Sequence, residues 1–180
     1  MSYPAFAADE YIFDKAHSHI GFKVSHMVLS KVSGNFNGFD GTIKFDENDI
    51  AKSSVNVKID AASINTDNTD RDKHLRSADF FNVEKYPEIT FSATRVEKTA
   101  DGLILHGNLA MTGVIKEVSI PFSFNGKLKD PWGNERIGFE GQTKINRKDF
   151  NITWNKVLDN GGLTVGDDVI IDLQVEAVKK

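Results

Sequence analysis

Hydrophobic and polar residues alternate along most of the chain with a period of two. This pattern is typical of β-strands with one buried face, because successive side chains on a strand point to opposite sides of the sheet. In the first such segment one face is apolar and ends in a histidine: Ile20, Phe22, Val24 and His26. We therefore expect His26 to point into the interior of the protein.

The alternation returns in several later segments, the clearest being residues 55–59, 103–111, 118–128, 137–145 and 169–177. Asn37-Gly38 predicts a tight hairpin turn between two strands, because this pair readily adopts positive φ angles. Gly107 falls in phase with inward-facing leucines, so it is expected either to preserve space in the interior or to allow a bend in the strand.

These segments predict an all-β protein of about eight antiparallel strands. Strands of ten residues would be ~33 Å long, which favours a tall closed barrel over a short sandwich. About eight strands is the size at which a barrel interior is either just filled or just wide enough for one small ligand. Periodicity does not distinguish a packed interior from a hollow one.

The exception to the β pattern is the stretch Arg71–Phe91. Asn65 or Thr66 can cap a helix there, and the acidic residues that follow suit its positive end. We expect a short helical segment near residues 67–81, followed by a strand after Pro87.

Composition narrows the functional classes. A chain of 180 residues fits one domain, and its formal net charge of −4 lacks the basic bias of nucleic-acid-binding proteins. There is no cysteine, which excludes disulfides and thiolate metal sites. We expect no nucleic-acid partner.

The N-terminus resembles the end of a secretory signal, because Ala5-Phe6-Ala7 has the small-x-small pattern of a cleavage site. We expect residues 1–10 to be a flexible remnant of such a region and residues 11–180 to form the domain. The alternative is that these are simply disordered starting residues.

Two groups of polar residues are candidate sites. His17 and His19 have the spacing of a metal-binding pair, but their parity places them on the outer face without a neighbouring carboxylate cluster, so we expect no metal. Charged residues between Arg71 and Asp79 form either a solvated helix face or a mouth that binds a polar headgroup. Arg147 and Asp149 lie in a similar setting of charge beside aromatics.

No catalytic signature is present: the chain lacks a G-x-S-x-G nucleophile elbow, a phosphate-binding loop and a dinucleotide fingerprint. We therefore expect no catalytic residues and no cofactor.

Several strings together resemble the YceI-like family, also called the polyisoprenoid-binding family, from about Tyr11 to Val178. They are Asp14-x-x-His17-Ser18-x-Ile20-x-Phe22, Val32-x-Gly34-x-Phe36, Arg71-Asp72-x-His74-Leu75-x-Ser77-x-Asp79-Phe80-Phe81, Tyr86-Pro87-x-Ile89-x-Phe91, Gly113-Val114-x-Lys116, Arg147-x-Asp149-Phe150 with Trp154, and Val165-Gly166-Asp167. Ile115 and Asn151 depart from the family pattern, where threonine and glycine are common.

The resemblance implies an elongated eight-stranded antiparallel barrel, lipocalin-like in shape, with a deep apolar pore and a helical segment at one end. It also implies binding of a long isoprenoid chain, such as a polyprenyl phosphate or an isoprenoid quinone, or of a related acyl lipid. Export to the periplasm is implied as well, and a catalytic reaction is not.

Combined with the alternation, the resemblance predicts the residues of the apolar pore: Phe22, Val24, Phe36, Phe45, Phe80, Phe81, Phe91, Leu105, Leu109, Ile120, Phe122, Phe139, Ile145, Phe150, Trp154 and Ile171. The candidates for binding a headgroup are His26, Arg71, His74, Arg147 and Asp149. Phe80 and Phe81 are either a lid over this pore or a plug of ordinary core.

The sequence thus favours a non-catalytic protein that binds, transports or stores an isoprenoid lipid in the periplasm, as a monomer or homodimer, with transient membrane contact. Two alternatives stay open. One is a metal-assisted hydrolase that uses His17 and His19, and the other is a β-structured adaptor with a packed core and no ligand.

Overall fold

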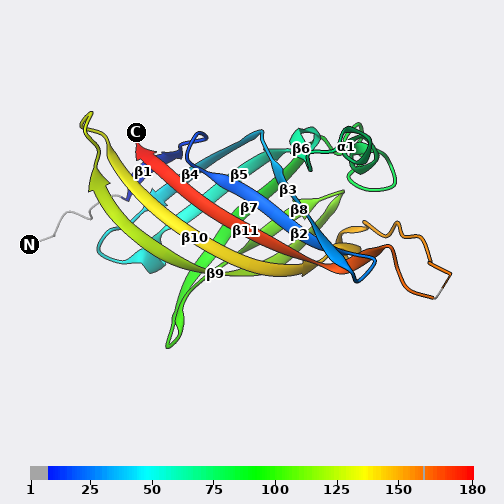
Figure 1. Ribbon diagram of the computed structural model, residues 1–180. Coiled ribbons are helices and arrows are strands. Elements are labelled where there is room, and N and C mark those ends of the chain that lie inside the picture. Colours follow the sequence, from blue (N-terminus) through cyan, green and yellow to red (C-terminus); the bar gives the residue numbers. More distant parts are fainter. Residues whose placement is uncertain (1–7, 160) are drawn as a thin grey trace, which may run out of the picture.

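The computed structural model describes residues 8–159 and 161–180, and its strands form one antiparallel sheet that closes into an elongated barrel (Figure 1). Eight strands make up the ring, which β11 closes by pairing with β1. In order around the barrel they are β1 (Asp9–Phe13), β4 (Phe39–Phe45), β5 (Ser54–Asp60), β7 (Glu88–Thr99), β8 (Gly102–Met111), β9 (Val114–Lys129), β10 (Glu135–Asn146) and β11 (Val165–Lys179). The predicted eight-stranded antiparallel, lipocalin-like barrel is confirmed.

The long strand β11 changes partner along its length. Its C-terminal residues 177–179 pair with β1, whereas residues 165–174 pair with β2 (His19–His26). β2 continues into β3 (Ser30–Phe36), and β3 pairs with the short β6 (Ile64–Asn65). These three strands extend the wall at one end of the barrel.

The tight hairpin predicted at Asn37-Gly38 is wrong. β3 and β4, on either side of it, pair with other strands, and neither residue adopts a positive φ angle. The Asn37 amide donates to the Ser63 carbonyl at 3.1 Å, and the Asp60 amide donates to the Gly38 carbonyl at 2.8 Å. Contact with this distant segment turns Asn37-Gly38 into a corner between strands.

The ordered domain begins two residues earlier than predicted. Asp9 and Glu10 belong to β1, where they pair with Phe45 and Lys44. The predicted remnant of a secretory signal therefore cannot extend to residue 10 as a flexible segment. Its residues 1–7 lie outside the described part of the chain.

The helical segment is shorter than predicted, because α1 covers only Thr69–Arg76. Its N-cap is Asn68, whose side chain accepts from the Arg71 amide at 2.9 Å, and not Asn65 or Thr66. Thr66 does not cap the helix. Its amide instead donates to the buried carboxylate of Asp72 at 2.9 Å.

Three short 3-10 helices complete the described secondary structure: η1 (Ile50–Lys52), η2 (Ala61–Ser63) and η3 (Arg147–Phe150). No helix in the described residues has the length and apolarity needed to span a membrane.

A β-bulge in β9 reverses the parity expected for the end of that strand. Phe124 is opposite Phe139, but Gly126 is opposite Gly138, so Asn125 is an extra residue on β9. An inserted residue exchanges the two faces of a strand. Leu128, expected inside, is consequently 62 % exposed.

Aromatic residues fill the end of the barrel near this bulge. Phe45 contacts Tyr11, Phe124 and Phe139, with ring centroids 6.1, 5.1 and 6.1 Å apart. The Tyr11 hydroxyl is buried and donates to Glu135. Burial and this carboxylate together hold the pKa of Tyr11 well above its usual value. This cluster closes one end of the barrel interior.

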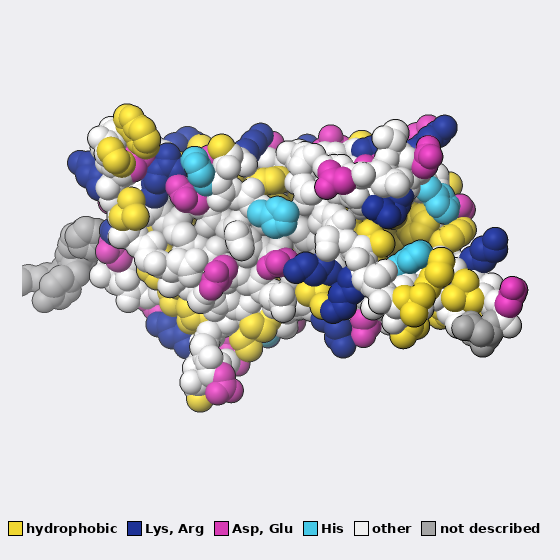
Figure 2. All heavy atoms as spheres, viewed as in Figure 1, with side chains coloured by type: hydrophobic (Ala, Val, Ile, Leu, Met, Phe, Trp, Pro, Cys, Tyr) yellow, Lys and Arg dark blue, Asp and Glu magenta, His cyan; other side chains and the backbone are white. Residues whose placement is uncertain are grey.

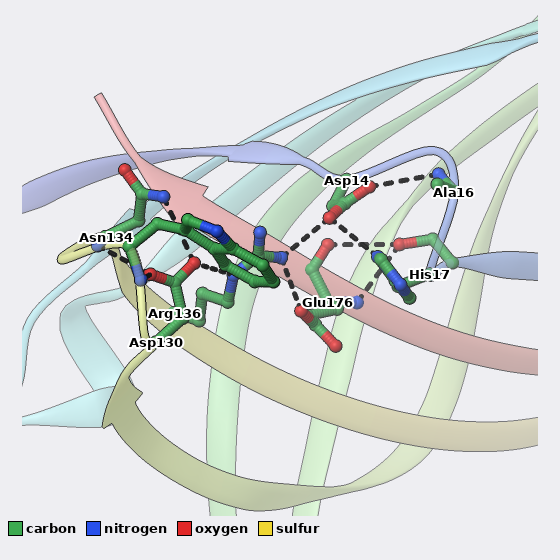
Figure 3. Close-up of polar contacts among 9 residues, drawn as sticks. Asp14, Ala16, His17, Asp130, Asn134, Arg136 and Glu176 are labelled. Carbon is green, nitrogen blue, oxygen red and sulfur yellow. Dashed lines mark hydrogen bonds and ion pairs between the residues drawn. The ribbon is translucent and has the colours of Figure 1, made fainter.

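Arg136 joins three carboxylates on the outside of the same end (Figure 3). Its guanidinium donates to Asp14 at 2.6 Å, to Asp130 at 2.7 Å and to Glu176 at 2.5 Å. These residues lie on the β1–β2 connection, the β9–β10 turn and β11. Arg136, with a smaller contribution from His17, lowers the pKa of Asp14 to about 2. The network ties together the seam at which β11 changes partner.

We expect Arg136→Gln to destabilise the protein by roughly 1.5–3 kcal/mol at neutral pH, because it leaves the carboxylates without their charged donor. The pKa of Asp14 is depressed in the folded state, so its stabilisation is present above its usual pKa and is lost as the pH falls through about 2. The difference from wild type in urea unfolding should therefore shrink in acid.

Lys144→Gln is the control for this prediction. Lys144 lies on β10, like Arg136, and forms an ion pair with Asp168 on β11 in which both side chains are more than half exposed. Such a pair contributes no more than about 1 kcal/mol. Equal stability losses for the two variants at neutral pH would show that the Arg136 network does not hold the seam.

Candidate functional site

The barrel interior beyond the aromatic cluster is hollow. It contains a cavity of about 450 Å³, within the range of roughly 300–1,000 Å³ that is typical of small-molecule sites. Interior side chains such as Leu105, Leu109 and Ile171 line this cavity and are only half-buried, although the strands point them inward. The structure therefore distinguishes a hollow barrel from a packed one, which the alternation left open.

Fourteen of the sixteen predicted pore residues line the cavity: Phe22, Val24, Phe36, Phe80, Phe81, Phe91, Leu105, Leu109, Ile120, Phe122, Phe139, Ile145, Trp154 and Ile171. Phe45 and Phe150 do not. Phe45 points inward but belongs to the aromatic cluster at the closed end. Phe150 ends η3 and is buried outside the cavity, where its carbonyl accepts from the hydroxyl of Thr112.

Gly107 lies opposite a β-bulge in β7, between Ala93 and Arg95, which agrees with the predicted bend. A Cβ atom at this position would overlap the ring of Phe91 and lie 2.7 Å from the Ser92 carbonyl oxygen. The glycine thus makes room for Phe91, which lines the cavity, and not for a ligand directly. Gly141 is also closely covered, since its Cβ would lie 3.1 Å from the Pro121 carbonyl oxygen.

Polar residues line the cavity at several places, among them Ser53 and Ser54 where β5 begins and Glu140 and Thr143 on β10. The histidines and arginines of the lining lie together at the end of the barrel formed by α1, the end of β2 and the connection 151–164, which Figure 1 shows. We call this end the mouth. Its polar lining residues are His26, Arg71, His74, Arg147 and Thr164.

Phe80 and Phe81 separate at the mouth. Phe80 packs against His74 and Trp154, with ring centroids 5.0 and 5.3 Å apart. Phe81 points deeper and contacts the ring of Phe36 at 5.7 Å. Of the two predicted roles, Phe80 has the position of a lid and Phe81 the position of a plug.

The two arginines proposed for headgroup binding differ in their partners. Arg147 is 4 % exposed, and its guanidinium donates to the carbonyls of Gly166, Ile152 and Trp154 at 2.7–2.8 Å. Burial lowers its pKa below the usual value. Its donors are committed to holding the connection 151–166 against β10, so its role is structural.

Arg71 is exposed at the mouth and keeps a free charge. It donates to the hydroxyl and the carbonyl of Thr66 at 2.7 and 2.8 Å, and no carboxylate of the described residues lies within ion-pair distance of it. A cation with only neutral partners can bind an anionic headgroup without first losing an ion pair.

The other three headgroup candidates have separate positions. His26 lines the cavity, as its parity predicts, and His74 lines it while its Nε2 lies 2.8 Å from Asp79. Asp149 does not line the cavity, because η3 directs its side chain toward Lys116 on β9, 3.5 Å away. The structure therefore corrects the prediction for Asp149.

The structure also corrects the argument made about His17. Carboxylates do gather beside it, since Asp14 and Glu176 offer oxygens within 4.8 Å of its ring nitrogen and of one another (Figure 3). The guanidinium of Arg136 already bridges both carboxylates. His19 is not part of this group, and its ring lies over Gly21 on the outer face. A metal ion at His17 would have to displace Arg136.

Sequence reasoning missed a chain of three side chains on the outer face. The ring of His106 forms hydrogen bonds with Ser119, through Nδ1 at 2.9 Å, and with Glu97, through Nε2 at 2.8 Å. His106 is buried, although the alternation along β8 points it outward. Hydrolysis by such a chain also needs a substrate pocket and oxyanion donors. Ser119 and His106 line neither the barrel cavity nor the shallower depression on the outer face. The chain is a cross-strand link between β7, β8 and β9.

Residues 11–177 match the YceI-like domain family. A UPF0312 protein of Pectobacterium atrosepticum is 43 % identical over 175 residues, which cover 96 % of this chain and 88 % of that protein. The Campylobacter jejuni YceI protein, whose crystal structure is known, is 37 % identical in sequence to this chain. The two structures superpose with a TM-score of 0.72 over 93 % of this chain and 96 % of that one.

A polyisoprenoid binding domain from Saccharophagus degradans shares the fold at lower identity. It is 15 % identical, with a TM-score of 0.69 over 96 % of this chain and 99 % of that one.

We expect Gly107→Ala to destabilise the protein by ~1–3 kcal/mol, because the added methyl group must displace Phe91 or the backbone at Ser92. Gly138→Ala in β10 is the matched control, since its Cβ would meet only the Asn125 Cβ at an ordinary 3.6 Å. The control should be neutral or gain up to ~1 kcal/mol. Urea unfolding measures both, and an unchanged Gly107 variant would contradict the packing of Phe91.

Proposed function

The chain belongs to the YceI-like domain family, and we propose that it binds a long-chain isoprenoid lipid in the barrel cavity. The observation that carries this proposal is the hollow, mainly apolar interior whose lining histidines and arginines lie at one end. A polyisoprenoid chain is long and has no polar groups, so it can place each carbon against this lining at a gain of about 0.8 kcal/mol per buried CH₂. The S. degradans domain, which shares the fold, is described as binding such a ligand.

We propose that the protein carries or stores this lipid in the periplasm without chemical turnover. The ligand would be a polyprenyl phosphate or an isoprenoid quinone, with its chain inside the barrel and its headgroup at the mouth. Arg71, His26 and His74 would then contact the headgroup, whereas Arg147 would hold the wall. The periplasmic location rests on Ala5-Phe6-Ala7 and on the family resemblance.

The alternatives are less well supported. A ligand-free adaptor requires a packed core, but the inward-facing residues of this barrel surround a cavity. A metal-assisted hydrolase would use His17 and His19, but neither histidine lines that cavity.

The direct test is gentle purification followed by native mass spectrometry and lipid extraction. We expect the wild-type protein to carry one hydrophobic chain per barrel. Leu105→Trp enlarges a side chain that lines the cavity and should reduce the bound lipid at least about tenfold, an effect of roughly 1.4 kcal/mol.

Ile104→Trp is the matched control, because Ile104 is the preceding residue of β8 and points outward, as the alternation of a strand requires. It should leave the bound lipid unchanged. Circular dichroism checks that both variants are folded. Absence of lipid from the wild-type protein, or equal lipid in the two variants, would refute the proposal.

Arg71→Gln should weaken binding of an anionic headgroup by roughly 1.5–3 kcal/mol. It should destabilise the fold less than Arg147→Gln does, because Arg71 is exposed and its guanidinium donates only to Thr66 among the described residues. Lys73→Gln on the exposed face of α1 controls for loss of charge. Arg147→Gln should instead lower the unfolding midpoint, since it leaves buried carbonyls without donors. Affinity for a polyprenyl phosphate that is unaffected by Arg71→Gln would exclude this arginine from the headgroup site.

A further inference from the structure

The turn between β2 and β3 presents large apolar side chains to solvent beside the mouth. Val28 and Leu29 are 87 % and 88 % exposed, and Met27 is 38 % exposed. The connection that follows η3 adds Val157 at 67 %. Single exposed hydrophobic residues are common, but a contiguous group that protrudes marks an interaction site.

Hydrogen bonds place the two segments side by side. The Met27 amide donates to the Thr164 carbonyl at 2.9 Å, and the Thr164 amide donates to the Lys156 carbonyl at 3.0 Å. Val157 pairs with Leu163, which is 39 % exposed, across the same loop. Figure 2 shows hydrophobic side chains gathered at this end of the barrel. We call the group the tip: Met27, Val28, Leu29, Val157 and Leu163.

The tip residues are unfavourable choices for folding alone. Met27 and Val28 occupy a turn at φ 50° and 61°, a conformation for which glycine and asparagine are preferred. A β-branched residue with positive φ is a genuine outlier, because the left-handed conformation brings its Cβ too close to the following carbonyl oxygen. Neither burial in the barrel nor turn geometry explains a valine at this position.

The tip is continuous with the cavity. His26 immediately precedes it and Thr164 lies beneath it, and both line the cavity at the mouth. The tip therefore borders the mouth through which a ligand would leave. An isoprenoid lipid has no appreciable solubility in water, so its exchange requires a membrane at this point.

Charge beside the tip also suits a membrane. Lys31 and Lys156 flank the apolar residues, and neither lies within ion-pair distance of a carboxylate in the described part of the chain. Asp159 lies further along the loop and carries one negative charge, so these three residues together have a net positive charge. Basic residues at the edge of an apolar group favour a surface that contains anionic lipids.

We propose that the tip inserts into the surface of a lipid bilayer that contains anionic lipids and so places the mouth on the membrane for lipid exchange. Its side chains at Val28, Leu29 and Val157 are 67–88 % exposed, which fits insertion into a deformable interface between headgroups and acyl chains. This inference rests on the proposed lipid-binding function, which it extends by naming the docking surface.

The test measures binding of the purified protein to two kinds of vesicle, one that mixes phosphatidylethanolamine with phosphatidylglycerol and one of phosphatidylcholine alone. We expect cosedimentation with the first kind and weaker binding to the second. The double variant Val28→Ser/Leu29→Ser should lose at least about tenfold in affinity for both. Lys31→Gln and Lys156→Gln should each lose about fivefold, for the anionic vesicles only.

Leu128→Ser/Trp132→Ser is the matched control, because these residues are 62 % and 82 % exposed near the closed end. It should bind vesicles like the wild type. Loss of binding in this control but not in the tip variant would overturn the proposal, as would vesicle binding that no substitution affects. A dimer that the tip substitutions abolish, without vesicle binding, would identify a second copy as the occupant and also overturn it.

The two proposals fail separately. Wild-type protein that carries lipid but does not bind vesicles would overturn docking at the tip and leave lipid binding intact. Protein that binds vesicles through the tip but carries and accepts no lipid would overturn the proposed function and leave the docking surface intact. Serine substitutions at the tip should not change unfolding in urea by much, because these side chains are exposed.

Discussion

Closure of the sheet is the constraint on which the rest of the structure depends. β11 pairs with β10 along one edge, and along its other edge it pairs first with β2 and then with β1. With the ring closed, every strand has an inner and an outer face, and the alternation along each strand supplies an apolar inner surface. Arg136 and its three carboxylates hold the seam at which β11 changes partner.

The two ends of this barrel are filled by different kinds of side chain, so one end is closed and the other forms the mouth. At one end Tyr11, Phe45 and their aromatic neighbours interlock, with the buried hydroxyl of Tyr11 satisfied by Glu135. At the other end the wall consists of α1 and an irregular connection that meet around polar side chains. Every buried side-chain nitrogen or oxygen in the described residues has a hydrogen-bond partner. A ligand in the cavity therefore meets a mainly apolar wall, with Ser53, Ser54, Glu140 and Thr143 as its polar residues outside the mouth.

The three arginines Arg136, Arg147 and Arg71 have different roles because their side chains have different hydrogen-bond partners. Arg136 is held by carboxylates and Arg147 by backbone carbonyls, so both are parts of the scaffold. Among the described residues the guanidinium of Arg71 donates only to Thr66, and it lies at the mouth, where its charge is available to a ligand. A buried cation whose donors are all used cannot bind a headgroup without leaving carbonyls unpaired, and that cost separates the two classes.

The sequence by itself determined the strand alternation, the approximate number of strands and the inward position of His26, because these follow from local periodicity. Most of the apolar lining was predicted from this alternation together with the family resemblance. Only the tertiary structure decided that the interior is hollow, since a cavity depends on how side chains from all the strands meet, as when the ring of Phe91 lies over Gly107. It also decided the roles of Arg147, Asp149 and Asn37-Gly38. Those roles depend on partners distant in the chain, and neither spacing nor residue type specifies such partners.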